Sequence, residues 1–333
     1  MHWPDTVCKP VTGETPQGEH MIDPSERHVP VLFQQAIDLL RIRPGGVYAD
    51  CTLGMAGHAE GIIRQLGPQG RLIGFDRDPE ALALAGSRID RVCAELGSQA
   101  PEVTLIGEAF SSIARHVQPA TLDGLLADFG TSSLHFDEAR RGFSFKAEDG
   151  PLDMRMDTRE GITAEQVVNE ESERELANLI YEYGNERRSR TVARAIVRGR
   201  PIATTGQLAR IVASAAPPMK NQRIHPATKT FQALRMYVNR ELEEIQALLE
   251  AAPKLLKPSG RLVVISFHSL EDRLAKDSLR EGGSQGIWKI LTKKPLEADE
   301  EETDRNPRSR SAKLRAAERT EIRGNGSEIG KVH

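Results

Sequence analysis

The sequence predicts an α/β fold in which a mostly parallel sheet is interrupted by a helical insertion. Short apolar runs alternate with segments of helical period over the first 130 residues, as in successive βα units. The first run leads into a glycine-containing loop and a helix, and the second run ends in an acid. Residues 130–260 separate the last two strand-like runs of this series, which is too long for a simple crossover.

The strands are expected where apolar and β-branched residues gather between turn signals. The predicted strands lie at 47–51, 71–76, 103–107, 122–129 and 261–267. Two further β-like pieces, 288–292 and 312–317, flank an acidic loop near the end of the chain. The first four strands follow one another at short intervals, so we expect them to form a parallel sheet with helices on its faces.

The insertion, residues 138–225, is expected to be helical. Three pairs of residues have the spacing of a capping box at the start of a helix. They are Thr163 with Gln166, Ser172 with Glu175, and Thr204 with Gln207. Pro226 is expected in the first turn of one long helix that follows the insertion and packs against the sheet. The apolar stripe of that helix comprises Phe231, Leu234, Val238, Leu242, Ile245 and Leu249.

These elements set the expected domain limits. With 333 residues, the chain is long enough for one large domain and a smaller second one. The expected parts are a disordered tail over 1–25, a main domain from 26–137 and 226–322, the insertion over 138–225 and a flexible tail over 323–333.

Bulk properties exclude several classes of protein. No apolar run approaches the roughly 18 residues of a membrane span, and the first twenty residues lack the apolar stretch of a signal peptide. The three cysteines, Cys8, Cys51 and Cys93, lie far apart and form no metal-type pair. A reducing, cytoplasmic location without a membrane partner is therefore the expectation.

The charges are unevenly distributed, although the net charge of −3 gives no overall sign of nucleic-acid binding. Residues 186–200 contain one acid, Glu186, and six arginines. The arginines are Arg187, Arg188, Arg190, Arg194, Arg198 and Arg200. A second basic segment, 305–319, follows an acidic one, 297–304. Such runs bind polyanions in some proteins and are solvated helix faces in others, and the sequence leaves both open.

Residues 50–58, Asp-Cys-Thr-Leu-Gly-Met-Ala-Gly-His, form the loop between the first strand and its helix, and Asp76 closes the second strand. Glycines let the backbone approach a ligand closely, and an acid at this offset accepts hydrogen bonds from ribose hydroxyls. The pattern predicts a site for an adenosine-containing cofactor, with an ordinary strand-to-helix turn as the alternative. A dinucleotide loop would carry Gly-x-Gly-x-x-Gly, and the missing first pair argues against a nicotinamide-dependent oxidoreductase.

Longer blocks carry a resemblance to a known family. They are Gly-Pro-Leu-Asp-Met-Arg-Met-Asp at 150–157, His-Pro-Ala-Thr-Lys-Thr-Phe-Gln-Ala-Leu at 225–234, Ser-Phe-His-Ser-Leu-Glu-Asp-Arg at 266–273 and Asn-Pro-Arg-Ser-Arg at 306–310. From about residue 28 to about residue 320, the chain resembles the bacterial ribosomal RNA small-subunit methyltransferase H family, the MraW-like enzymes.

The resemblance implies a fold, an activity and partners. The fold is that of a class I S-adenosylmethionine-dependent methyltransferase, a Rossmann-like, mostly parallel sheet, with an inserted helical domain that recognises the substrate. The implied activity is methylation of N4 of a cytidine in the decoding region of 16S rRNA, with S-adenosylmethionine as cofactor. The implied partner is the small ribosomal subunit in the cytoplasm, and a homodimer remains open.

The resemblance also assigns cofactor contacts to individual positions. Two of them depart from the family pattern, because Ala56 replaces a glycine and His135 replaces a glutamine. If the backbone at Ala56 needs a positive φ, alanine costs roughly 1 kcal/mol or more there. These departures leave open a non-catalytic module that binds RNA or cofactor. The assigned residues are Ala56, Gly57 and His58 in the loop, Asp76 at the ribose, Phe110 near the adenine, Asp128 after the fourth strand, and His135.

Asp128 and His268 are the candidate catalytic residues. An acceptor beside the amine of cytosine localises its lone pair and takes its proton, and Asp128 closes a strand where α/β sites form. Cofactor positioning is the alternative role of Asp128. His268 is expected to line the base pocket, or else to belong to a helix start with Ser269 as N-cap and Asp272 at the third position. No metal cluster is evident in the sequence, and none is predicted.

Several residues have both a functional and a structural interpretation. The target base must be extruded from RNA to reach the cofactor, and Phe143 and Phe145 either stack on it or belong to the core. Ser132 and Ser133 either orient the base or cap the next turn. A structural ion network is expected of Asp153, Arg155 and Asp157.

Overall fold

The computed structural model of the protein describes residues 30–131, 135–136, 138–146, 150–217 and 224–321. The predicted tails over 1–25 and 323–333 lie outside the described residues, as do Ser132 and Ser133. Within the described ranges, every helix is too short or too polar to cross a membrane.

The chain divides into two compact units, which we describe separately. The first comprises the described residues of Met1–Asp76, Leu82–Phe129 and Ile245–His333. The second comprises those of Arg77–Ala81 and Gly130–Glu244. The predicted domain limits at 138 and 225 stay predictions, because compactness alone does not establish which segment folds as an inserted domain.

The first unit contains a seven-stranded sheet in the order β3-β2-β1-β4-β5-β7-β6. Strands β1 to β5 pair in parallel with one another, and β7 pairs antiparallel with both β5 and β6. Because the strand order reverses at β1, the carboxyl ends of β1 and β4 form the switch point where ligands bind in such sheets. The strands are β1 (Val47–Asp50), β2 (Arg71–Phe75), β3 (Glu102–Ile106), β4 (Leu122–Asp128), β5 (Leu256–Ser266), β6 (Trp288–Ile290) and β7 (Lys313–Arg319).

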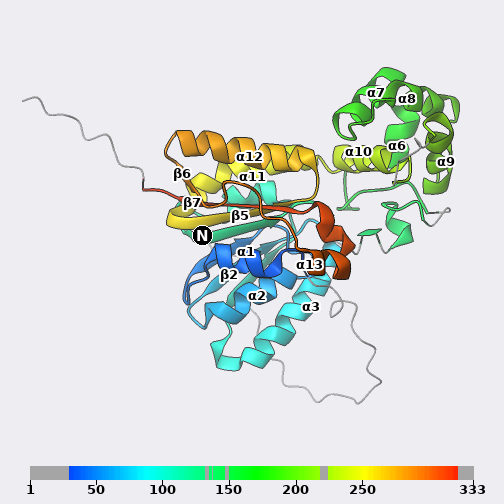
Figure 1. The fold of residues 1–333 in the computed structure, drawn as a ribbon. Coiled ribbons are helices and arrows are strands. Elements are labelled where there is room, and N and C mark those ends of the chain that lie inside the picture. Colours follow the sequence, from blue (N-terminus) through cyan, green and yellow to red (C-terminus); the bar gives the residue numbers. More distant parts are fainter. Residues whose placement is uncertain (1–29, 132–134, 137, 147–149, 218–223, 322–333) are drawn as a thin grey trace, which may run out of the picture. The chain divides into compact units, whose positions relative to one another are not determined.

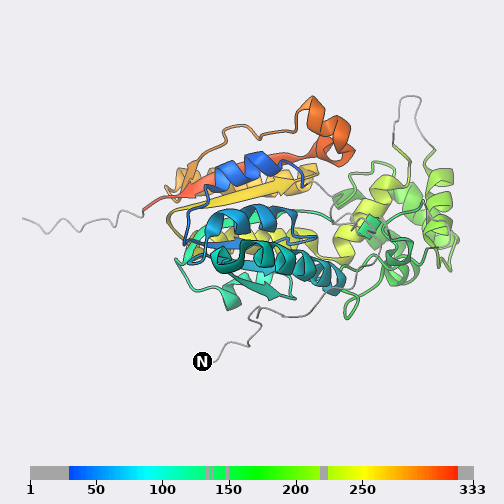
Figure 2. The same ribbon diagram turned by 90° about the horizontal axis from the view of Figure 1, so that it is seen from below.

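Helices cover both faces of this sheet (Figure 1). Successive residues of β1 point to opposite faces, so Tyr48 belongs to a core cluster that includes residues of α1, α2 and α3, whereas Ala49 belongs to one that includes residues of α4, α11 and α12. Figure 2 shows β5, in yellow, beside β7, in red. The helices are α1 (Phe33–Leu40), α2 (Gly57–Leu66), α3 (Pro79–Leu96), α4 (Ile113–His116), α11 (Glu241–Leu255), α12 (Ser269–Ser284) and α13 (Glu300–Arg305), with short 3-10 turns η2 (Gly97–Gln99), η3 (Phe110–Ser112) and η5 (Pro307–Ser311).

The predicted fold class and all seven predicted β segments are confirmed. The largest difference is in β5, which begins at Leu256 rather than at 261, with a register shift against β4 between Leu122 and Gly124. The antiparallel β6 and β7 complete the mostly parallel sheet, as expected for the β-like pieces near the end of the chain.

The second unit is a helical layer with its own apolar core. Buried residues of α6, α7, α8, α9 and α10 form that core, including Val168, Ile180, Val192, Leu208 and Leu234. All three predicted capping boxes are present, at the starts of α6, α7 and α9. The elements are η4 (Ala139–Arg141), α6 (Ala164–Glu170), α7 (Glu173–Glu182), α8 (Ser189–Arg198), α9 (Thr205–Ala215) and α10 (Thr228–Val238).

The prediction of one long helix from Pro226 is wrong. The segment is two helices, because α10 ends at Val238 and Arg240 adopts a left-handed conformation with φ of 50° before α11 begins. Asn239 stabilises the break, since its buried side chain accepts from Met156 N at 2.7 Å and donates to Met154 O at 2.7 Å. Pro226 precedes the helix, whose N-cap is Ala227.

Candidate active site

The loop after β1 is held in place by backbone hydrogen bonds at the carboxyl ends of the strands. Leu53 N donates to Phe75 O at 2.9 Å, and Ala56 N donates to Leu53 O at 2.7 Å. Gly54 N donates to Asp76 Oδ2 at 2.8 Å. The predicted ribose acid therefore lies against the glycine loop, and the two together form one edge of the candidate cofactor site.

Ala56 has the backbone conformation for which glycine is expected. Its φ is 59° and its ψ is 27°, which is the left-handed region, and it is the N-cap of α2. The side chain is fully buried. An alanine in this region carries a strain of roughly 1 kcal/mol or more relative to glycine. The departure from the family pattern thus has a conformational cost.

Gly57 and His58 are the first two residues of α2, and both are tightly packed against neighbouring residues. A Cβ atom on Gly57 would lie 2.3 Å from Pro30 Cγ, so only glycine fits there without movement. His58 is buried, and its ring stacks on Phe33 with 6.0 Å between ring centroids. Its Nδ1 lies 3.9 Å from Asp128 Oδ2, so this imidazole faces the acid at the end of β4.

Asp128 combines a fixed backbone with an available carboxyl oxygen. Its backbone N–H donates to Thr52 Oγ1 at 2.6 Å, which joins the end of β4 to the loop. Although 23% of the side chain is exposed, Oδ1 is buried and has no hydrogen-bond partner among the described residues. Desolvation, together with the negative charges of Asp50 and Glu271, raises the pKa of Asp128 well above its usual value.

Asp50, the last residue of β1, is a buried acid to which the sequence analysis assigned no role. It is 1% exposed and accepts a hydrogen bond from Thr52 N at 3.1 Å. Burial, with a contribution from the charge of Asp76, raises the pKa of Asp50 to about 7. Asp50 and Asp128 are the last residues of β1 and β4, and Asp76 directly follows β2, so three carboxyl groups gather at the carboxyl ends of parallel strands.

Comparison with known proteins identifies the family of the chain that carries this cluster of acids. The model of the MraW methylase family matches residues 25–320 of the chain. The chain belongs to this family. Two proteins named ribosomal RNA small subunit methyltransferase H are similar to the methylase over most of their length. That of Acidobacterium capsulatum is 68% identical over 294 residues, which are 88% of this chain and 99% of the relative. That of Koribacter versatilis is 57% identical over 306 residues, which are 91% of this chain and 97% of the relative.

The methylase is an S-adenosylmethionine-dependent methyltransferase, and its loop fits that cofactor. The buried, unpartnered Asp128 Oδ1 is an acceptor for a ligand donor. The gathered carboxyl groups of Asp50, Asp76 and Asp128 complement a cationic sulfonium. Phe110, half-buried in η3, packs against Phe129 with ring centroids 6.2 Å apart and offers an apolar surface after β3. The nicotinamide-dependent alternative is thereby set aside.

The start of α12 differs by one residue from the prediction. His268, not Ser269, is the N-cap, and Glu271, not Asp272, is the third helical residue. The fully buried Glu271 carboxyl accepts from Phe267 N at 2.8 Å and from His268 N at 3.2 Å. Its other oxygen lies 2.9 Å from His268 Nε2. His268 thus has the helix-start role, and its contact with a base stays a prediction.

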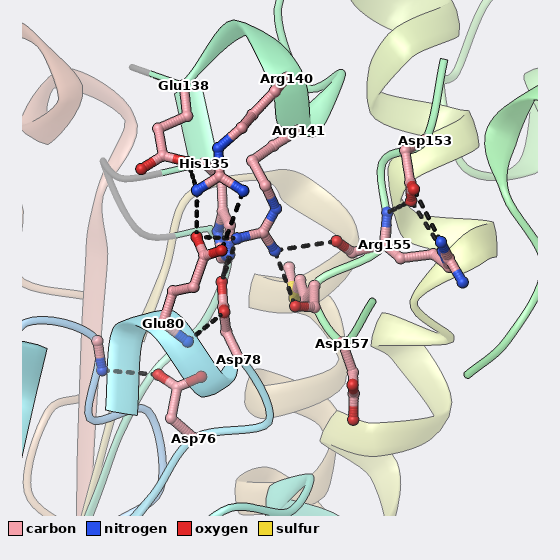
Figure 3. Close-up of polar contacts among 12 residues, drawn as sticks. Asp76, Asp78, Glu80, His135, Glu138, Arg140, Arg141, Asp153, Arg155 and Asp157 are labelled. Atoms are coloured by element: carbon pink, nitrogen blue, oxygen red, sulfur yellow. Dashed lines mark hydrogen bonds and ion pairs between the residues drawn. The ribbon is translucent and has the colours of Figure 1, made fainter. Parts of the chain in front are cut away.

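In the second unit of the methylase, His135 belongs to a buried polar cluster (Figure 3). Its Nε2 lies 2.7 Å from Asp78 Oδ2, and Arg141 Nη1 lies 2.9 Å from the same oxygen. Burial opposes ionisation of Asp78, but the hydrogen bond with His135 and the charge of Arg141 prevail and lower its pKa. The ring of His135 stacks on Phe143 at 4.7 Å. The predicted cofactor contact of His135 stays a prediction.

The aromatic and ionic candidates of this unit have structural partners. Phe143 is buried, and Phe145 packs against Phe231 with 4.9 Å between centroids, so both belong to packed clusters. The expected ion network is instead a set of short-range pairs. Arg155 Nε pairs with Asp153 Oδ1 at 2.8 Å, as Figure 3 shows, and Asp157 pairs with Arg159 at 2.7 Å.

Proposed function

We propose that this methylase transfers a methyl group to N4 of a cytidine in the decoding region of 16S rRNA, acting on the small ribosomal subunit in the cytoplasm. Family membership and the name of its relatives support the choice of small-subunit rRNA. The single observation that carries the chemistry is the buried Asp128 Oδ1, an acceptor without a partner among the described residues at the end of β4.

Asp128 is proposed as the acceptor for the exocyclic amine of the cytosine. When bound, S-adenosylmethionine supplies the electrophilic methyl group, so the protein has to align and activate the nucleophile. A hydrogen bond from the amine to Asp128 would localise the nitrogen lone pair that the ring otherwise delocalises. The N–C bond would form as the bond from the methyl carbon to sulfur breaks and its electron pair stays on sulfur, and the Asp128 carboxylate would take the proton that the amine loses.

The raised pKa of Asp128 suits this role. A carboxylate of ordinary pKa is a weak base near neutral pH, whereas desolvation beside Asp50 and Glu271 makes Asp128 a stronger one. A neighbouring cation favours its ionised form, so Asp128 is more readily ionised when a positively charged ligand lies beside it. His58, with Nδ1 3.9 Å from Asp128 Oδ2, is proposed to orient the carboxyl.

Of the contacts assigned by resemblance, those of the first unit at the loop, Asp76 and Phe110 are proposed to bind the cofactor. Asp76 would accept from the ribose hydroxyls, Phe110 would pack against the adenine, and the backbone of residues 54–58 would pass close to the ligand. The target base would be extruded from RNA to reach the cofactor.

The test uses small subunits that lack the modification and methyl-labelled S-adenosylmethionine. We expect label in a nucleoside that co-elutes with N4-methylcytidine, and label in 5-methylcytidine or on another base would contradict the proposal. Asp128→Asn should lower kcat about 100-fold or more. The Kd of S-adenosylhomocysteine should stay within a few-fold of that of the unmodified protein. The control is Asp38→Asn, at an exposed acid of α1, which should leave both this Kd and the activity unchanged. Near-normal turnover by Asp128→Asn would rule out an essential acceptor there.

A further inference from the structure

Three exposed arginines lie on one side of α8, and a fourth, Arg187, lies two residues before the first residue of the helix. We propose that this side, which we call the α8 arginine face, binds consecutive phosphates of the RNA substrate, and the proposal rests on the proposed function. The three members within α8 recur every four residues, which places them on one side of the helix, and Arg187 comes three residues before the first of them. The members are Arg187, Arg190, Arg194 and Arg198.

The helix presents these side chains in a fixed direction. On the opposite side, Ser189, Val192, Ala193 and Ile196 are buried in the second unit. At 100° per residue, the three arginines within α8 fall within about 80° of arc, and at 1.5 Å per residue they extend over about 12 Å. These exposed side chains therefore point to solvent as a row. Figure 1 shows α8 beside α7.

The six arginines of residues 186–200 have two different roles. Arg188 donates to Pro217 O at 2.8 Å and pairs with Glu186. Arg200 donates to Val168 O at 2.7 Å. These two side chains stabilise the unit itself. The sequence pattern grouped all six together, whereas the structure leaves four for an external partner.

The positive charges of the exposed arginines are largely unbalanced by nearby acids of the protein. Among the described residues, Arg187, Arg190 and Arg198 have no acid within ion-pair distance, and Arg194 has Glu173 at 3.3 Å, where both side chains are exposed. Like charges at these spacings destabilise a helix by a few tenths of a kcal/mol per pair. In addition, α8 has no acid in its first turn and no side-chain cap. Repulsion among these arginines therefore destabilises α8 locally, and an external anion bound to the face would reduce that repulsion.

An RNA strand is the anion that fits this row. Guanidinium groups bind phosphate oxygens through paired, charge-assisted hydrogen bonds, and a row of them matches a chain of regularly spaced phosphates. Phosphate contacts position a protein on nucleic acid without reading sequence. The α8 arginine face would then contribute to substrate affinity and to salt dependence, and the chemical step would not depend on it.

The test compares two double variants of the full chain. Arg190→Gln with Arg198→Gln removes two charges of the face, and Arg115→Gln with Arg280→Gln removes two exposed charges of the first unit. At about 0.1 M salt, we expect the first variant to raise the KM for small subunits about tenfold and to retain kcat. It should also reduce the magnitude of the slope of log(kcat/KM) against log[salt] by about 1.4, which is about 0.7 for each phosphate contact. The second variant should change neither.

Two further measurements keep the outcomes distinct. The urea midpoint of the Arg190/Arg198 variant should be equal to or above that of the unmodified protein, because like-charge repulsion is removed. Direct binding to a 16S rRNA fragment, measured without cofactor, reports the contribution of the face to RNA affinity. This measurement is informative even if the methylated position differs from N4 of cytidine. Unchanged RNA affinity and unchanged salt slope in that variant would overturn the proposal, and would be the result if the face bound an acidic protein.

Discussion

The carboxyl group of Asp76 accepts a hydrogen bond from the backbone N–H of Gly54, with 2.8 Å between Gly54 N and Asp76 Oδ2. This contact connects the end of β2 to the loop after β1. The acid that is expected to bind the ribose therefore also fixes the loop that is expected to approach the ligand. A change at Asp76 should alter both the ligand contact and the loop.

Substitutions at Asp76 should separate these two effects. Asp76→Asn keeps an oxygen that can accept from Gly54 N but loses the charge, so the Kd of S-adenosylhomocysteine should rise about tenfold, as for a lost charge-assisted hydrogen bond. Asp76→Ala loses both contacts and should raise it further. Isothermal titration calorimetry gives both values. Equal, small effects of the two variants would contradict a ribose contact.

Ala56→Gly should stabilise the protein. Alanine in the left-handed region costs about 1–2 kcal/mol, and glycine offsets part of the gain because it loses about 0.5–1 kcal/mol more chain entropy on folding. We expect a net increase of about 0.5–1 kcal/mol in the free energy of unfolding, measured by urea titration. Ala59→Gly is the matched control, because Ala59 is equally buried in the first turn of α2 and has no left-handed strain to relieve, so this variant should be less stable. A loss of stability in both variants would mean that Ala56 is not strained.

Local patterns predicted the sheet because each strand is marked by its own apolar run, and they predicted α6, α7 and α9 because each capping box lies within four residues. The break at Arg240 was missed, since it is stabilised by Asn239 contacting residues more than 80 positions away. A continuous apolar stripe gives no sign of such a contact.

The candidate site was predicted only in part, because local patterns show which acids follow a strand but not which of them are buried together. Asp76 and Asp128 were found by their position at the ends of strands, and Asp50 has that position too. Its importance comes from burial beside other acids, which depends on strands that are distant in sequence. A rule that treats every acid at a strand end as a candidate would have found it.

The stability of the protein should fall between about pH 4 and pH 7 because of Asp50. Its pKa is raised from 3.8 to about 7 in the folded protein, so in this range the folded state holds a proton that the unfolded state has lost. The unfolded state then binds fewer protons, and the free energy of unfolding decreases with pH by up to about 1.4 kcal/mol per unit, levelling off above the folded pKa.

Asp50→Asn isolates this contribution. The amide cannot ionise, and its oxygen can still accept from Thr52 N. The difference in the free energy of unfolding, variant minus unmodified protein, should therefore increase from pH 4 to pH 7 and stay constant above about pH 7.5. Urea titrations at half-unit steps of pH measure it. A difference that is flat over this range would show that Asp50 ionises normally in the folded protein.

Gly57→Ala should destabilise the protein through a clash with Pro30. The new Cβ would lie 2.3 Å from Pro30 Cγ, so the start of α2 or the chain at Pro30 has to move, at a cost of about 1–3 kcal/mol. Because Gly57 begins the helix that follows the cofactor loop, the Kd of S-adenosylhomocysteine should rise as well. The double variant Pro30→Ala/Gly57→Ala removes the contacting ring atom and should recover at least half of the lost stability relative to Pro30→Ala alone. If the two changes are additive, the clash is not the cause, and the effect of Gly57→Ala would lie in the backbone of the helix start.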